Sequence, residues 1–210
     1  MSEIVYVLTN EAMEGLVKIG RTTTSIEQRM RDLDNTSLPL PFECFYAAEV
    51  ANSSVVERRL HHIFSDKRIR TNREFFRTDP NQVKSAILLA EIREITPKSD
   101  VVTDEADIQA LKNVAAREER RSRLRFSELN IPAGAILHFV QDENVTCEVV
   151  ADGKVLFEGD TISPTGAARI LLKRLGYDRY NLNGNTYWMY EDETLSARRF
   201  RMEDERETSF

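Results

Sequence analysis

The chain contains little cysteine, and this limits the covalent and metal chemistry open to it. Only two cysteines occur among 210 residues, Cys44 and Cys147, and neither belongs to a C-x-x-C pattern. A disulfide framework or a cysteine-based zinc site requires several paired or clustered cysteines. The sequence therefore argues against both and favours a reducing compartment, so we expect a cytoplasmic protein.

Long apolar runs are also missing. No run approaches the roughly 20 residues that a membrane-spanning helix requires, and no basic-then-apolar leader is present. Hydrophobic residues make up 41% of the chain and charged residues 30%, which is ordinary for a globular protein. The sequence predicts no contact with a membrane, and its 210 residues suffice for one large domain or two small ones.

An excess of positive charge is absent as well, because the formal net charge is −6. This argues against a generic polyanion binder, although charge can still be concentrated locally. One segment holds such a concentration, made of Arg58, Arg59, Lys67, Arg68, Arg70, Arg73 and Arg77. Either phosphate contacts or solvated helix faces would explain this basic segment, and both readings stay open.

Residues 1–95 read as a small α+β domain with a three-stranded antiparallel sheet. Residues 4–8 and 16–19 predict a hairpin, and residues 42–50 predict a third strand. Ser25 followed by Gln28 predicts the start of a helix.

Two further helices are expected in this domain. Ser53 or Ser54 can cap the first of them, which carries Leu60 inward. Asp79 followed by Pro80 predicts the start of the second, which we expect to run through Ile92.

Short motifs in this domain resemble those of the GIY-YIG endonuclease superfamily. Ile4-Val5-Tyr6 stands at the G-I-Y position and Lys18-Ile19-Gly20 at the Y-I-G position. The second motif is closest to a branch of small phage-type and fungal domains that reads K-I-G. Arg29 follows at the family's arginine, and the E-x-x-L-H and E-F-F motifs are present as residues 57–61 and 74–76. The resemblance covers residues 4–92 and implies a metal-dependent nuclease.

The resemblance assigns catalytic roles to Tyr6, Lys18, Arg29, Glu57 and His61, and chemistry supports each assignment. A phenol or an amine can activate or orient water, and a guanidinium can neutralise phosphate oxygens. Glu57 would hold one Mg²⁺ or Mn²⁺ ion, which keeps several waters. His61 lies one helical turn later and can move protons.

The sequence also departs from the family pattern. Lys18 stands where a second tyrosine is usual, and Asn72 is only near the place of the late asparagine. Zinc at His61-His62 is a weaker alternative, because no third ligand lies nearby. Candidate DNA contacts are Arg21, Arg58, Arg68, Arg70, Arg73 and Trp188.

Residues 96–125 read as a linker followed by a charged helix, which is a connector or an arm pairing two copies of the chain. Residues 126–210 predict a second small α+β module with a meander of strands, a helix capped by Ser163, and a polar frayed tail from Arg201. This module resembles RAMA (restriction enzyme adenine methylase associated) domains. The carrying motifs are I-x-x-G at 131–134, V-x-F-x-G at 155–159, S-P-x-G-A-A at 163–168 and N-G-x-x-Y-W at 183–188.

Together the two resemblances imply a DNA endonuclease with a C-terminal module that targets DNA, modified DNA included. Trp188 would stack on a base, or else anchor the core of the module. The alternative function is a non-catalytic nucleic-acid-binding or regulatory protein on a degenerate nuclease scaffold. An adaptor that dimerises through residues 104–125 is the third.

Overall fold

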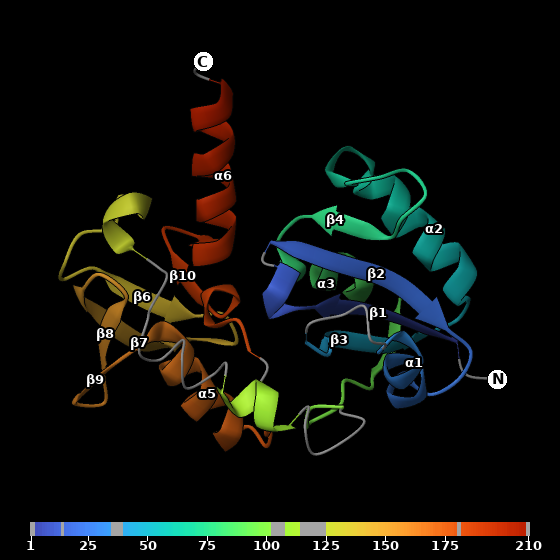
Figure 1. Cartoon of the computed structure of the whole chain (residues 1–210), viewed down its shortest axis with the longest axis horizontal. Coiled ribbons are helices and arrows are strands. Elements are labelled where there is room, and N and C mark those ends of the chain that lie inside the picture. The colour runs from blue at the N-terminus through green and yellow to red at the C-terminus, as the bar shows by residue number, and fades with distance from the viewer. Residues whose placement is uncertain are drawn as a thin grey trace. The chain divides into compact units, whose positions relative to one another are not determined.

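The computed structural model describes residues 3–13, 15–34, 40–101, 108–113, 125–179 and 182–208. The chain divides into two compact units, residues 1–111 and 112–210. Both units combine helices with an antiparallel sheet, so the predicted α+β class is confirmed (Figure 1). None of the helices in the described ranges has the length and hydropathy needed to span a membrane.

The first unit is built on a five-stranded sheet in the order β4-β2-β1-β3-β5 (Figure 1). Its elements are β1 (Ile4–Thr9), β2 (Leu16–Thr22), α1 (Ile26–Leu33), β3 (Glu43–Val50), α2 (Ser53–Ile63), β4 (Phe75–Arg77), α3 (Pro80–Leu88) and β5 (Glu91–Glu94). The hairpin of β1 and β2 and the third strand lie where the sequence predicts them.

The sheet of the first unit has five strands, so the prediction of three strands was wrong. Residues 75–77 pair with β2, and residues 91–94 pair with β3, so each side of the sheet gains a strand. The helix predicted through Ile92 ends at Leu88, and Ile92 lies in β5 with 66% of its surface exposed. An edge strand with one solvent-facing side explains why an apolar residue at this position is not helical core.

Local capping chemistry fixes the helices of this unit. The Ser25 side chain accepts the Gln28 N–H at the start of α1, as predicted. Asp79 accepts the Asn81 N–H ahead of Pro80, also as predicted. For α2 the prediction was wrong by one residue, since Asn52 caps the helix by accepting the Val55 N–H. Ser53 instead donates to the Glu3 carboxylate from both its backbone and its hydroxyl.

One core cluster holds the sheet against α1. Because β1 alternates, Ile4, Tyr6 and Leu8 share one face of the strand, and all three are buried. Ile26 and Met30 of α1 belong to the same cluster. Helices α2 and α3 make their contacts with β1, β2 and β3 as well, so the hairpin that carries the family motifs lies at the centre of the unit.

The second unit is built on a six-stranded sheet in the order β11-β10-β6-β7-β8-β9 (Figure 1). Its elements are β6 (Ile136–Phe139), β7 (Asp142–Ala151), β8 (Lys154–Phe157), β9 (Asp160–Ile162), α5 (Pro164–Arg174), β10 (Trp188–Tyr190), β11 (Glu193–Thr194) and α6 (Leu195–Thr208). The meander β6-β7-β8 and the Ser163 cap are confirmed. The tail is not frayed in the described range, because α6 continues to Thr208 with the ion pairs Arg199–Glu203 and Arg201–Glu205.

The segment between the units is described only in part. Residues 108–113 are helical, as expected for the charged helix, and Leu111 is buried in the first unit. Residues 102–107 and 114–124, which carry most of the predicted dimerising arm, lie outside the described residues. The arm and the homodimer stay predictions.

Candidate active site around Gly20

The first unit gathers the predicted catalytic residues around one glycine of β2. Tyr6 lies opposite Gly20 in the β1–β2 register. A Cβ atom on Gly20 would come within 2.6 Å of the Tyr6 phenol oxygen, so the ring occupies the space that any other residue would fill. This close approach gives a physical reason for the glycine of the K-I-G motif.

The Tyr6 phenol is paired with Arg29. The Arg29 Nε–H donates to the phenol oxygen at 3.1 Å from one turn inside α1. Tyr6 has no exposed surface, whereas Arg29 is half-buried. Burial raises the pKa of Tyr6 above 10, against the opposing effects of the Arg29 hydrogen bond and charge, so the phenol stays protonated at neutral pH.

Lys18 is also buried, and its partner is Glu74. The two side chains form an ion pair with an Nζ–Oε2 distance of 2.5 Å, and the Lys18 side chain is 9% exposed against 39% for Glu74. The ammonium also lies 5.4 Å from the centroid of the Phe75 ring. Burial raises the pKa of Glu74, but the hydrogen bond and charge of Lys18 outweigh it and leave the pKa below its ordinary value.

Helix α2 contributes Glu57 and His61. Glu57 accepts a hydrogen bond from Arg21 Nε at 3.2 Å, and its side chain is 18% exposed. His61 Nε2 lies 3.0 Å from the Ile19 carbonyl oxygen, and its ring contacts Phe76 with centroids 5.1 Å apart. Both contacts join α2 to the strand that carries the K-I-G motif, so the four-residue spacing of the two side chains matches a single helix face.

Electrostatic coupling shows that these groups form one cluster. The charges of Glu74 and Glu57 both act on the Tyr6 phenol. The charges of His61 and Arg29 both act on Glu74. The structure therefore brings together all five residues predicted to be catalytic, and it adds Glu74, whose only signal in the sequence was the E-F-F motif.

The predicted DNA contacts are less uniform. Arg58, Arg70 and Arg73 are exposed, and Arg21 is bound to Glu57. Arg68 is half-buried, donates to the Arg73 carbonyl oxygen at 2.7 Å and lies over the Phe76 ring. Arg68 therefore shapes its loop, and its neighbours present the exposed charge.

The prediction that Trp188 stacks on a DNA base is wrong. It is 0% exposed, its indole N–H donates to the Pro164 carbonyl oxygen at 2.8 Å, and Phe139 and Phe157 contact its ring edge-on. A ring enclosed in this way cannot receive a base without unfolding the unit. The alternative reading, a core anchor, describes its observed position.

A metal ion at this site would depend on few protein ligands. Among the residues that the structure describes, no group of three His, Cys, Asp or Glu side chains could hold a metal ion. The partly exposed carboxylate of Glu57 fits a Mg²⁺ ion that is bound by one carboxylate, waters and a substrate phosphate. It does not fit a structural zinc ion, which needs four protein ligands.

One comparison with known families bears on this arrangement. Residues 3–91 match the family model of the T5orf172 domain. No curated protein and no solved structure matched the chain. The T5orf172 match begins one residue before β1 and ends in β5, so it contains every member of the cluster around Gly20.

Proposed function

We propose that the chain is a metal-dependent DNA endonuclease of the GIY-YIG type, whose active site is the cluster around Gly20. The observation that supports this most is the hydrogen bond between Arg29 and the buried Tyr6 phenol, with Glu57 and His61 beside it on α2. The T5orf172 domain belongs to a family of phage-type nuclease-associated domains. Its match to residues 3–91 supports a nuclease or DNA-binding role for this segment.

Burial divides the site into an accessible layer and a supporting layer. Arg29, Glu57 and His61 are partly exposed, so a scissile phosphate can reach them. Tyr6 and Lys18 are buried beneath, at 0% and 7% exposure. We therefore revise the proposed role of Tyr6 from activating water to positioning Arg29, because a buried phenol with a raised pKa is protonated near neutral pH and cannot accept a proton from water.

Hydrolysis in this site would proceed in line. A water oxygen attacks phosphorus, the bond to the leaving oxygen breaks, and that oxygen takes up a proton. Arg29 binds the phosphate oxygens whose charge grows, and Lys18, ion-paired with Glu74, lies buried beneath the partly exposed groups. His61 accepts the proton of the attacking water or passes one to the leaving oxygen. A Mg²⁺ ion on Glu57 would supply Lewis-acid stabilisation of the same charge.

Plasmid cleavage with Mg²⁺ or Mn²⁺ tests the proposal. We expect nicking by the wild type and a loss of at least 100-fold in Glu57→Ala and Arg29→Ala, a size typical of lost transition-state contacts. Arg31→Ala and Glu27→Ala are matched controls, because both residues lie on α1. Wild-type protein without metal-dependent cleavage on modified or unmodified DNA would refute the nuclease, and cleavage that persists in Glu57→Ala would refute the metal assignment.

A positioning role for Tyr6 has its own signature. Tyr6→Phe removes the acceptor of Arg29 but keeps the ring against Gly20. We expect a lower kcat with a smaller change in KM, and a pH–rate profile of unchanged shape, because no titrating base is lost. If Tyr6→Phe removed one limb of the pH–rate profile, the result would show instead that the phenol titrates during catalysis.

A non-catalytic nucleic-acid-binding protein is the second candidate, and two ion pairs favour it. Lys18 is neutralised by Glu74 and Glu57 is engaged by Arg21. In that case DNA binding would fall with added salt and survive both Glu57→Ala and Arg29→Ala without any cleavage.

We propose for the second unit, on its RAMA-like motifs, the role of a module that targets DNA, including modified DNA.

A further inference from the structure

The second unit contains a cavity of about 420 Å³ beside helix α5. Four of its lining residues, Gly166, Arg169, Ile170 and Lys173, follow the spacing i, i+3, i+4 and i+7 and so form one face of the helix. The rest of the lining consists of Lys154, Thr161, Ile162 and Ser163, from β8, β9 and the helix cap. The core side of α5, which includes Ala167 and Leu171, is buried against the sheet and is separate from this face.

The charge on this cavity has a single sign. Lys154, Arg169 and Lys173 line it, and its lining includes no Asp or Glu. The neighbouring Arg174 lies outside the lining, and its two terminal nitrogens each lie 2.6 Å from an oxygen of Glu158. The cavity extends along α5 from Gly166 in the first turn, where Ser163 caps the helix, to Lys173 in the last turn. These features favour an anionic ligand.

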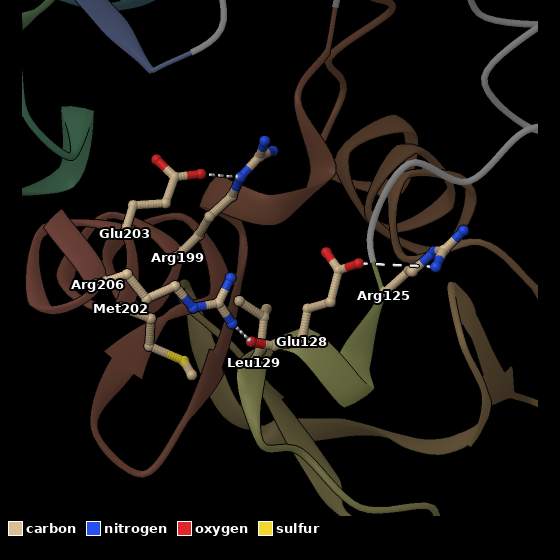
Figure 2. Close-up of a pocket in the computed structure, with 7 residues that line it drawn as sticks. All are labelled: Arg125, Glu128, Leu129, Arg199, Met202, Glu203 and Arg206. Carbon is tan, nitrogen blue, oxygen red and sulfur yellow. Dashed lines mark hydrogen bonds and ion pairs between the residues drawn. The ribbon is translucent and has the colours of Figure 1, made fainter. Parts of the chain in front are cut away.

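A second hollow in the same unit is lined by residues of both charge signs. It measures about 80 Å³ and lies between α6 and residues 125–129 (Figure 2). Its arginines are engaged there: Arg199 pairs with Glu203 at 2.9 Å, and Arg206 donates to the Glu128 carbonyl oxygen at 3.2 Å (Figure 2). That hollow is much smaller and its lining includes the carboxylates Glu128 and Glu203, so the cavity beside α5 is the better site for a sizeable anion.

Size and apolar surface narrow the class of ligand. A cavity of 420 Å³ falls within the range of small-molecule sites and exceeds what a bare phosphate fills. Ile170 is 39% exposed on the helix face, and Ile162 is a second apolar residue of the lining. The hydroxyl groups of Thr161 and Ser163 add hydrogen-bonding capacity to the same lining. The lining thus combines a place for an anion with apolar walls for a flat group.

We propose that this cavity binds one nucleoside 5′-phosphate unit, with its phosphate at Lys154, Arg169 and Lys173 and its base between Ile162 and Ile170. The unit comes from a free nucleotide or from an unpaired position of a DNA strand. This site is independent of the cluster around Gly20, so it stands whether or not the first unit cleaves DNA.

Nuclear magnetic resonance on the full chain tests the proposal. The probes are a deoxynucleoside 5′-monophosphate, the corresponding deoxynucleoside, inorganic phosphate, a short single-stranded oligonucleotide and its duplex. We expect the monophosphate to shift the Gly166 amide and the Ile162 and Ile170 methyl signals, at least tenfold more tightly than phosphate or the nucleoside. Tighter binding of the single strand than of the monophosphate assigns the source to DNA, and the reverse order assigns it to a free nucleotide.

Substitutions locate the binding. Lys173→Glu, at an exposed position, should weaken binding of the monophosphate at least tenfold. Ile170→Asp should weaken the monophosphate as well by placing a negative charge inside the cavity. Arg174→Ala is the matched control on the same helix, because Arg174 is held by Glu158 outside the lining, and it should bind like the wild type.

Several results would overturn the proposal. They are an absence of shifts at Gly166, Ile162 and Ile170, equal affinity for phosphate and monophosphate, and undiminished binding in Lys173→Glu. A chain carrying Arg29→Ala and Glu57→Ala serves as a further control. Its monophosphate binding should match that of the wild type, so failure of this site and failure of the nuclease proposal are told apart.

Discussion

Gly20 lies directly against the phenol ring of Tyr6, and no side chain would fit between them. A Cβ atom on Gly20 would lie 2.6 Å from the phenol oxygen and 2.7 Å from the ring carbon that bears it. The neighbour that would have to move is a fully buried ring. The contact therefore links the shape of the sheet to the position of the Arg29 guanidinium, which is bonded to the same phenol.

Gly20→Ala should destabilise the protein by about 1–3 kcal/mol, the usual cost of overpacking a core. Denaturant unfolding measures this change. The control is Tyr6→Ala, which removes the ring, so adding Gly20→Ala to it should cost much less than adding it to the wild type. Equal costs in the two backgrounds would show that the ring and the glycine do not interact.

Removing the ammonium of Lys18 should also destabilise the first unit. Lys18→Met keeps most of the length of the side chain but leaves the Glu74 carboxylate without its partner, at an expected cost of about 1–3 kcal/mol. Glu74→Gln in the Lys18→Met background should recover part of the loss. No recovery would mean that the two side chains contribute separately.

The same ion pair predicts a dependence of stability on pH. Because the pKa of Glu74 in the folded protein lies below its ordinary 4.5, the stabilisation is complete above 4.5 and is lost as the pH falls through the lowered value. Urea midpoints between pH 6 and 3 should fall less steeply in Glu74→Gln than in the wild type. If the urea midpoints of the two proteins fell in parallel with pH, the lowered pKa of Glu74 would be contradicted.

The single tryptophan provides a direct test of the buried ring. Trp188 should emit at short wavelength, resist quenching by acrylamide and show no change when DNA is added. Trp188→Ala should cost about 3–5 kcal/mol, as expected for a large buried aromatic ring. Quenching of the native emission by DNA would restore Trp188 as a contact residue.

Neither cysteine should react in the folded protein. Cys44 and Cys147 are both buried, and burial raises the pKa of the Cys147 thiol to about 12, so its thiolate is scarce near neutral pH. Ellman's reagent should label both thiols only after unfolding. Rapid labelling of the native chain would contradict this burial.

Local signals in the sequence were sufficient for much of the fold. The capping residues Ser25, Asp79 and Ser163 act as their spacing predicts, since a cap involves atoms two or three residues apart. Strands β4 and β5 were missed because each is short and lies at a sheet edge, where pairing with a distant strand decides the structure.

The candidate site was predictable as a set of residues but not as a set of contacts. The motifs indicated Tyr6, Lys18, Arg29, Glu57 and His61, which the fold brings together. The pairing of Lys18 with Glu74 joins positions 56 residues apart, and no local pattern encodes such a contact. Trp188 was misassigned as a DNA contact because a motif tryptophan reads the same in a core as on a binding surface.

The loop before β4 links the basic segment to the site through main-chain bonds. The Ile69 N–H donates to the Phe75 carbonyl oxygen at 3.0 Å, and the Ile19 N–H donates to the Glu74 carbonyl oxygen at 3.1 Å. Strand β4 has only three residues, so its pairing depends on both β2 and the preceding loop. A strand of DNA that immobilises Arg70 and Arg73 would therefore slow amide hydrogen exchange at Ile19, on the far side of β4 from the DNA itself.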